Sequence, residues 1–80
     1  MMTFEPVTND AEAIEYLNTV SVLRDGHFTV MKFTTNWRVG IGTANNREQI
    51  RLLSEGRSFI EATNNLKAKL IGEAYRNALN

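Results

Sequence analysis

The segment SEGRSFIEATNNLKAKL, residues 54 to 70, holds the residue spacing with the clearest chemical meaning in this chain. Ser58 follows a glycine and an arginine, and Glu61 comes three positions later, ahead of apolar residues at helical spacing. Helices that bind phosphate groups open in the same way, because the N–H groups of a first helical turn are free to bind anions. The spacing is equally that of a capping box, in which Ser58 accepts a backbone N–H and Glu61 reaches back. We interpret it as a capping box.

Arginines gather in the segment before this helix. Arg47 and Arg51 are one helical turn apart and would share a helix face, and Arg57 stands at the junction that follows. Together they are suited to bind an acidic protein or a phosphate group. The interpretation we favour is a solvated face, partly paired with Glu48 and Glu55, since surface ion pairs contribute little. No aromatic residue alternates with these arginines, so the base-stacking component of single-strand binding is missing.

Catalytic and metal-binding sets are absent from the sequence. His27 is the single histidine, and there is no cysteine, whereas metal sites with nitrogen and sulfur ligands use several such residues. Ser21, Ser54 and Ser58 lack the strained turn that exposes a nucleophilic serine. The glycines of GIGT, residues 40 to 43, lack the third glycine of a dinucleotide-binding loop. We therefore predict no catalytic residue, no cofactor, no metal site and no enzymatic activity.

Length and charge set the class of protein. Eighty residues predict a single domain spanning residues 1–80 with modest stability, about 5 kcal/mol. The net charge is zero, but residues 1 to 23 carry four acidic and no basic groups, while the rest carry nine basic and five acidic groups. Apolar runs are too short for a membrane span, and MMTFEPVTND lacks the basic and apolar regions of a signal peptide. We expect a soluble cytoplasmic protein, in the host cell cytoplasm if it is phage-encoded.

The first elements are an arm and a helix. Residues 1 to 8 are predicted to form an N-terminal arm, which Phe4 and Val7 are placed to pin to the core. Asn9 and Glu12 have the spacing of a capping box and start a helix. The predicted buried stripe of this helix consists of Ala13, Ile14 and Leu17.

The end of this helix has two interpretations. Thr19, Val20 and Val22 are β-branched, and Asp25-Gly26 is a strong hairpin signal. We favour a strand at 19–24, followed by a second strand at 27–34. The alternative is a helix that continues through Leu23.

A hairpin follows. Trp37, Val39 and Ile41 alternate with small or polar residues, as in a half-buried strand. With Thr35-Asn36 as the turn, Val30 is opposite Ile41. One face then holds the predicted core residues Phe28, Val30, Trp37, Val39 and Ile41. The other face places Met31 and Phe33 beside glycines and Arg38, either to cover bare backbone or as a contact surface.

The C-terminal part is predicted to be helical. Asn46 and Gln49 have capping-box spacing, so we place a short helix at 47–54, with a strand through QIRLL as the alternative. The last helix runs from Ser58 to Leu79 on a 3.6-residue apolar period. It is longer than a small sheet needs, so residues 72–80 are expected to project and to offer Tyr75 to another chain. The predicted core joins Trp37 to this helix through Leu17, Phe28, Val30, Phe59, Leu66 and Leu70.

Two families resemble parts of this pattern. The order helix, three strands, helix, with GRS entering the last helix and Ala62 following, is similar to a double-stranded-RNA-binding domain. That resemblance implies phosphate-binding lysines at the start of the helix, where this chain has Phe59, Ile60 and Thr63. SFIEATNNLKAKL also resembles the helix of HicB-type antitoxin domains. Both resemblances imply a regulator that binds nucleic acid.

The predicted fold is α+β: a small antiparallel three-stranded meander packed on one face by N- and C-terminal helices, in the order α-β-β-β-α-α. The predicted function is non-enzymatic binding of a partner protein, as in small phage or prophage accessory and inhibitor proteins. A nucleic-acid-binding regulator that uses the basic edge is the alternative, and a homodimer through the helix end or a sheet edge is left open. The predicted partner-binding residues are Met31, Phe33, Arg38, Arg47, Arg51, Arg57 and Tyr75.

Overall fold

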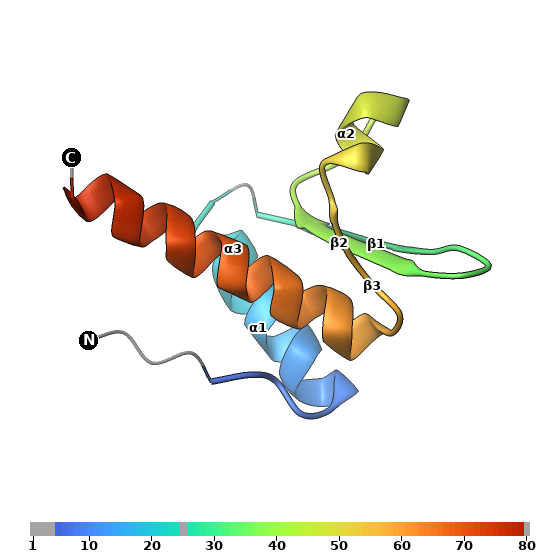
Figure 1. The fold of residues 1–80 in the computed structure, drawn as a ribbon, viewed down its shortest axis with the longest axis horizontal. Helices are drawn as coiled ribbons and strands as arrows, with labels where there is room; N and C mark the ends of the chain where they lie inside the picture. The colour runs from blue at the N-terminus through green and yellow to red at the C-terminus, as the bar shows by residue number, and fades with distance from the viewer. Residues whose placement is uncertain (1–4, 25, 80) are drawn as a thin grey trace.

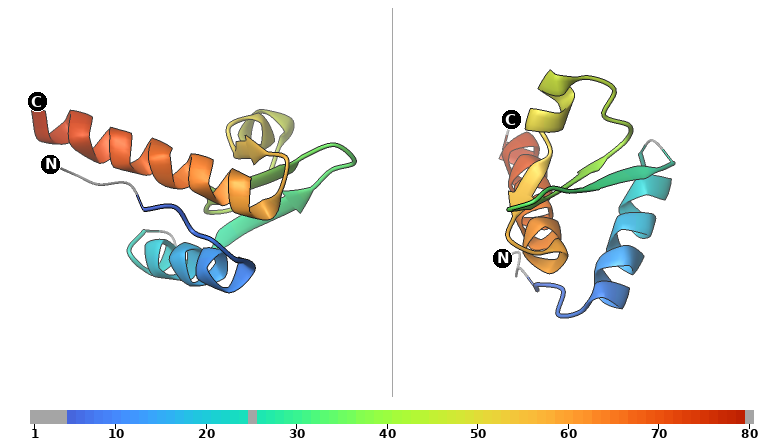
Figure 2. Two further views of the ribbon diagram at one scale, coloured as in Figure 1. Left: turned by 60° about the horizontal axis from the view of Figure 1, so that its bottom comes forward. Right: turned by 90° about the vertical axis from the view of Figure 1, so that its right-hand side faces the viewer.

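The computed structural model of the protein describes residues 5–24 and 26–79, and side chains up to residue 74. Its elements follow in the order α1 (Asp10–Val22), β1 (Phe28–Lys32), β2 (Trp37–Ile41), α2 (Arg47–Arg51), β3 (Ser54–Gly56) and α3 (Phe59–Leu79). The strands form an antiparallel sheet in the order β1-β2-β3. Both α1 and α3 lie on one side of the sheet and α2 on the other (Figures 1 and 2). The predicted α+β class and its terminal helices on one face of a meander are confirmed.

The first helix is longer than predicted. Residues 19–24 do not form a strand, because α1 continues to Val22. The hydroxyl of Ser21 donates to the Leu17 carbonyl at 2.5 Å, and Ser21 is buried beside Leu17 on the helix face that meets the core. The free energy of this packing outweighs the strand preference of the β-branched residues, which is weak. Asp25 lies outside the described residues, and Gly26 follows it with a φ of 84°.

The third strand begins at Ser54, the last residue of the segment predicted as a helix, and continues to Gly56. The short helix α2 ends at Arg51, and Ser54 and Gly56 pair with Val39 and Trp37 of β2. Gly56 is buried against the start of α3, where an added Cβ would lie 2.3 Å from the backbone nitrogen of Ala62. A side chain at this position would separate β3 from α3. The helix predicted at 47–54 is therefore correct only in its first part.

The β1–β2 hairpin has its turn one residue earlier than predicted. Val30 is opposite Val39, not Ile41, and the N–H of Phe33 donates to the Asn36 carbonyl at 2.7 Å around Thr34-Thr35. Asn36, just before β2, is connected to β3 because its side-chain amide donates to the Glu55 carboxylate at 3.0 Å. The register differs from the predicted one by two residues. Since side chains alternate with a period of two, the inward face is unchanged.

The core lies between the sheet and the two long helices. Its buried centre consists of Leu17, Val39, Ala62 and Leu66. Trp37 is half-buried against it and packs on Phe59 with ring centroids 5.8 Å apart. Val30 and Ile14, predicted as core residues, are 38% and 45% exposed. Alternation and helical spacing identified their faces but not how far the covering helices reach.

The N-terminal arm is attached to α3 by its backbone. The side chain of Asn64 accepts the N–H of Val7 at 2.7 Å and donates to its carbonyl at 3.1 Å. Val7 is buried, as predicted, while Phe4 lies outside the described residues. Within the described part of the chain, none of the helices has the length and apolar character to cross a membrane.

Candidate functional site

The start of α3 is a capping box. The N–H of Glu61 donates to Ser58 Oγ at 3.0 Å, and the Glu61 carboxylate accepts the N–H of Arg57 at 3.3 Å. The carboxylate therefore stands at the positive end of the helix, where it is favourable by its charge. One of the first-turn N–H groups that a phosphate would use, that of Glu61, is already bound to Ser58. The capping interpretation is confirmed.

The predicted arginine patch is divided by β3. Arg47 and Arg51 are exposed on α2, before this strand, and Arg57 is exposed after it. Figure 1 shows α2 and the β3–α3 turn at opposite ends of β3. Glu55, which the sequence offered to these arginines, instead lies 3.5 Å from Arg38. A ligand that touches all three arginines would have to span the strand.

Arg38 connects elements on the outer face of the sheet. Its guanidinium donates to the Ile50 carbonyl at 3.2 Å, lies 3.5 Å from the Glu55 carboxylate and stands 5.6 Å from the centre of the Phe33 ring. Next to it, Leu53 covers Gly40, whose added Cβ would lie 2.3 Å from a Leu53 methyl group. Of the predicted surface, Phe33 is exposed and Met31 is half-buried. The Tyr75 side chain lies outside the described residues.

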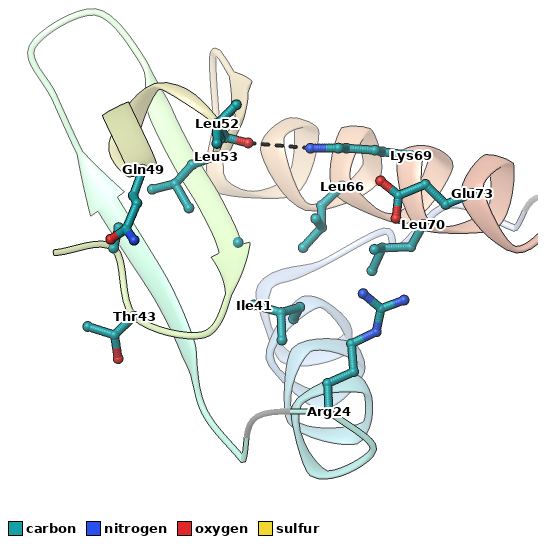
Figure 3. A pocket seen from close by; sticks show the side chains of 12 residues that line it. Arg24, Ile41, Thr43, Gln49, Leu52, Leu53, Leu66, Lys69, Leu70 and Glu73 are labelled. Carbon is teal, nitrogen blue, oxygen red and sulfur yellow. Dashed lines mark hydrogen bonds between the residues drawn. The ribbon is translucent and has the colours of Figure 1, made fainter. Parts of the chain in front are cut away.

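A groove opens between α2, the end of β2 and α3 (Figure 3). Its volume is about 320 Å³, and the apolar side chains of Ile41, Leu53, Leu66 and Leu70 line it. At its α2 rim Leu52 is 71% exposed. The Leu52 carbonyl accepts a hydrogen bond from the Lys69 ammonium at 3.4 Å.

The rim of the groove is charged. Arg24 approaches from the C-terminal end of α1, and Lys69 and Glu73 come from α3 (Figure 3). The sequence did not predict this groove. The adjacent leucines of QIRLL were a signal, because two large apolar side chains in so short a helix are difficult to bury together.

A second hollow of about 300 Å³ lies between the N-terminal arm, α1 and α3. Glu5, Glu12 and Glu15 line it together with Tyr16 and Lys67. Lys67 donates to the Glu5 carbonyl and stands 5.2 Å from the centre of the Tyr16 ring. Burial raises the pKa of Tyr16, and the charge of Arg24 opposes this in part. The basic group of α3 thus meets the acidic N-terminal segment here.

His27 is exposed, and its Nε2 contacts the hydroxyl of Thr43. Among the residues that the structure describes, there is no group of three or more His, Cys, Asp or Glu side chains arranged to hold a metal ion. Of the predicted partner-binding residues, the structure brings Phe33 and Arg38 together and leaves Arg47 and Arg51 on a separate helix.

Comparison of this chain with known protein families, with curated proteins and with solved structures finds no match. The similarities to double-stranded-RNA-binding and HicB-type domains therefore rest on element order and short segments alone.

Proposed function

We propose that the protein is a non-enzymatic module that binds a partner protein in the cytoplasm and acts by occupying it, as small phage-type accessory and inhibitor proteins do. The observation that carries this proposal is the groove between α2 and α3, where apolar side chains lie among polar and charged ones and Leu52 is exposed at the rim. The proposed occupant is an apolar side chain presented by an acidic segment of the partner.

The groove supports protein binding by its composition. Apolar pockets bordered by exposed apolar side chains are typical anchoring points of interfaces, where one or two large side chains contribute most of the affinity. A volume of about 320 Å³ accommodates such an anchor. Arg24 and Lys69 outnumber Glu73 on the rim, so an acidic partner segment is favoured electrostatically.

Two leucines of this chain form a matched pair for the test. Leu52 and Leu23 are the C-cap residues of α2 and α1, with φ of −81° and −79°. They are 71% and 79% exposed, but Leu52 lines the groove and Leu23 does not. Replacing either leucine with glutamate therefore makes a similar change in folding and in net charge.

The experiment is capture from native lysate with wild type, Leu52→Glu and Leu23→Glu as baits, followed by titration of the purified partner by calorimetry. We expect a protein that is retained by wild type and by Leu23→Glu, and that binds Leu52→Glu at least about tenfold more weakly, the effect of losing about 1.4 kcal/mol. Equal binding to all three baits, or the absence of any retained protein, would contradict the proposal.

Binding of nucleic acid is the alternative function. The observation that favours it is that Arg47 and Arg51 are exposed one turn apart on α2, with no ion pair to an acid among the described side chains. It requires duplex RNA or DNA binding that weakens with salt and is lost in Arg47→Ala/Arg51→Ala. Salt-dependent binding to the wild type, retained in Leu52→Glu, would establish this function in place of the protein-binding one.

A further inference from the structure

The two edges of the sheet differ. At one edge, β3 has three residues, and the carbonyl of its Glu55 accepts the side-chain amide of Asn65 from α3 at 2.7 Å. At the other edge, β1 has five residues and is the terminal strand of the sheet. Open edges of this kind offer unpaired N–H and C=O groups to another strand. One edge of this sheet is therefore closed by α3, and the other is available.

The hydrogen bonds of the hairpin show which backbone groups of β1 point outward. The His27 carbonyl accepts the N–H of Gly42 at 2.9 Å, and the N–H of Phe33 donates to Asn36 at 2.7 Å. In an antiparallel pair, residues that bond to the partner strand alternate with residues that do not. Between His27 and Phe33, the residues whose N–H and C=O face away from β2 are consequently Phe28, Val30 and Lys32.

Apolar side chains lie beside this edge. Val30, at the centre of β1, is 38% exposed, and Ile14 of α1 is 45% exposed. Tyr16 is on the side of α1 that faces α3, because Lys67 of α3 stands over its ring. Two residues along a helix correspond to a rotation of about 200°, so Ile14 is on the opposite side. Since α1 contacts β1 and β2 while α3 contacts β2 and β3, that side of α1 is at the β1 edge.

We infer that a second copy of this chain pairs with β1 in antiparallel fashion, around a two-fold axis at Val30. In this register Val30 is opposite Val30 of the second copy, and Phe28 is opposite Lys32 of the second copy. The outward backbone groups of the two strands bond to each other, and the sheets join into one. The helices of both copies lie on the same face, where Ile14 of each copy approaches the axis.

A second copy fits this edge for three reasons. The register places a β-branched pair at the centre and no like charges opposite each other, which is the favourable combination for cross-strand neighbours. The Lys32 ammonium lies 5.8 Å from the centre of the Trp37 ring, so it is directed over β2 and leaves the edge uncovered. Finally, the far edge is closed at β3, so the assembly ends at two copies, as an isologous contact does. The inference is independent of the groove, which lies between α2 and α3.

Substitutions at the axis test this register. In Val30→Glu and in Val30→Lys, the same charge faces itself across the axis, so each variant is expected to be monomeric. An equimolar mixture of the two variants places opposite charges together and is expected to recover a dimer. The measurement is sedimentation equilibrium at concentrations up to about 1 mM, the weak end of protein association, with circular dichroism to confirm that each variant is folded.

A cross-link provides a second measurement that does not depend on charged variants. The chain has no cysteine, so Val30→Cys carries a single thiol. Directly opposed hydrogen-bonded residues have Cα atoms about 5.5 Å apart, within the range of a disulfide. Oxidation with diamide at concentrations where the wild type is dimeric should convert most of Val30→Cys to a covalent dimer, while Leu52→Cys, exposed at the C-cap of α2, remains largely monomeric.

Several outcomes would overturn the inference. These are a wild type that stays monomeric up to about 1 mM, charge variants that remain dimeric, a mixture that does not recover the dimer, or equal cross-linking at residues 30 and 52. Leu52→Glu should leave the dimer intact. Loss of partner binding in that variant and loss of dimerisation in the Val30 variants are thus separate results.

Discussion

Gly56 allows a close backbone contact between β3 and α3. A Cβ at this position would lie 2.3 Å from the Ala62 nitrogen and 2.8 Å from its Cα. Both are backbone atoms of a helix, so they cannot turn aside as the end of a flexible side chain can. Gly72, in the same helix, has no atom within 4 Å of an added Cβ. A side chain therefore has no space at Gly56 but has open space at Gly72.

We expect Gly56→Ala to lower the free energy of unfolding by about 1–3 kcal/mol, because the added methyl group overpacks the β3–α3 contact. Gly72→Ala should raise it by about 0.5–1 kcal/mol, since alanine is the better helix former. Urea unfolding followed by Trp37 fluorescence measures both changes. Wild-type stability in Gly56→Ala would show that β3 does not lie against the first turn of α3.

The helices share one type of N-terminus. Asn9 accepts the N–H of Glu12, Asn46 that of Gln49, and Ser58 that of Glu61, at 2.9 to 3.0 Å. In each case the side chain of the third helical residue (Glu12, Gln49 or Glu61) accepts a hydrogen bond from the N–H of the residue before the cap. At α1 this return contact is doubled, because the hydroxyl and the N–H of Thr8 both donate to the Glu12 carboxylate.

This contact predicts an acid-dependent stability of α1. The hydrogen bonds from the Thr8 hydroxyl and N–H lower the pKa of Glu12 below its usual value of 4.5, against a smaller opposing effect of desolvation, and the charge of Lys67 lowers it further. A carboxyl group whose pKa is lower in the folded state stabilises the fold above its unfolded pKa, and this stability is lost as the pH falls through its folded pKa. The melting temperature should therefore fall below pH 4.5 more steeply in wild type than in Glu12→Gln. Parallel melting curves for the two proteins across this range would exclude a contribution of Glu12.

The sequence predicts those features of the elements that depend on neighbouring residues. Capping boxes depend on a spacing of three residues, and the inward faces of the hairpin depend on alternation, so both were predicted correctly. The end of α1 depends on the burial of Ser21 in the core, and β3 exists because Ser54–Gly56 finds a place between β2 and α3. Neither contact is visible in local propensity. For the same reason the groove was missed, since Leu52 and Leu70 come from elements far apart in the chain.

Arg38 shows how far the sequence alone can predict the role of a site residue. The sequence places it on the sheet face away from the core, and we predicted that it binds a partner. The structure shows its guanidinium engaged with Ile50, Glu55 and Phe33. A charged residue on a sheet face has the same pattern whether it meets a partner or its own chain, so its role depends on where α2 and β3 lie.

The stability of the molecule is distributed unevenly. Its buried apolar centre comes from α1, β2 and α3, and the arm is attached to α3 through Asn64. In contrast, α2 has five residues and no buried side chain. It is held by its capping box, by the Arg38 bond to Ile50 and by Leu53, which packs on Gly40. Segments with few buried contacts open locally at lower free energy than the core.

Hydrogen exchange should show this difference directly. We expect amide protection in Arg47–Arg51 to be at least about tenfold lower than at Val39 and Leu66, because α2 opens without unfolding the core.

Since α2 forms one wall of the groove, a bound partner should raise protection there, as a ligand stabilises the state that it binds. The measurement is exchange followed by NMR, with Leu23→Glu and Leu52→Glu as controls. Uniform protection in the free protein would mean that α2 belongs to the cooperative core. A partner that protects the outer strand β1 and leaves α2 unchanged would move the binding surface from the groove to the sheet edge.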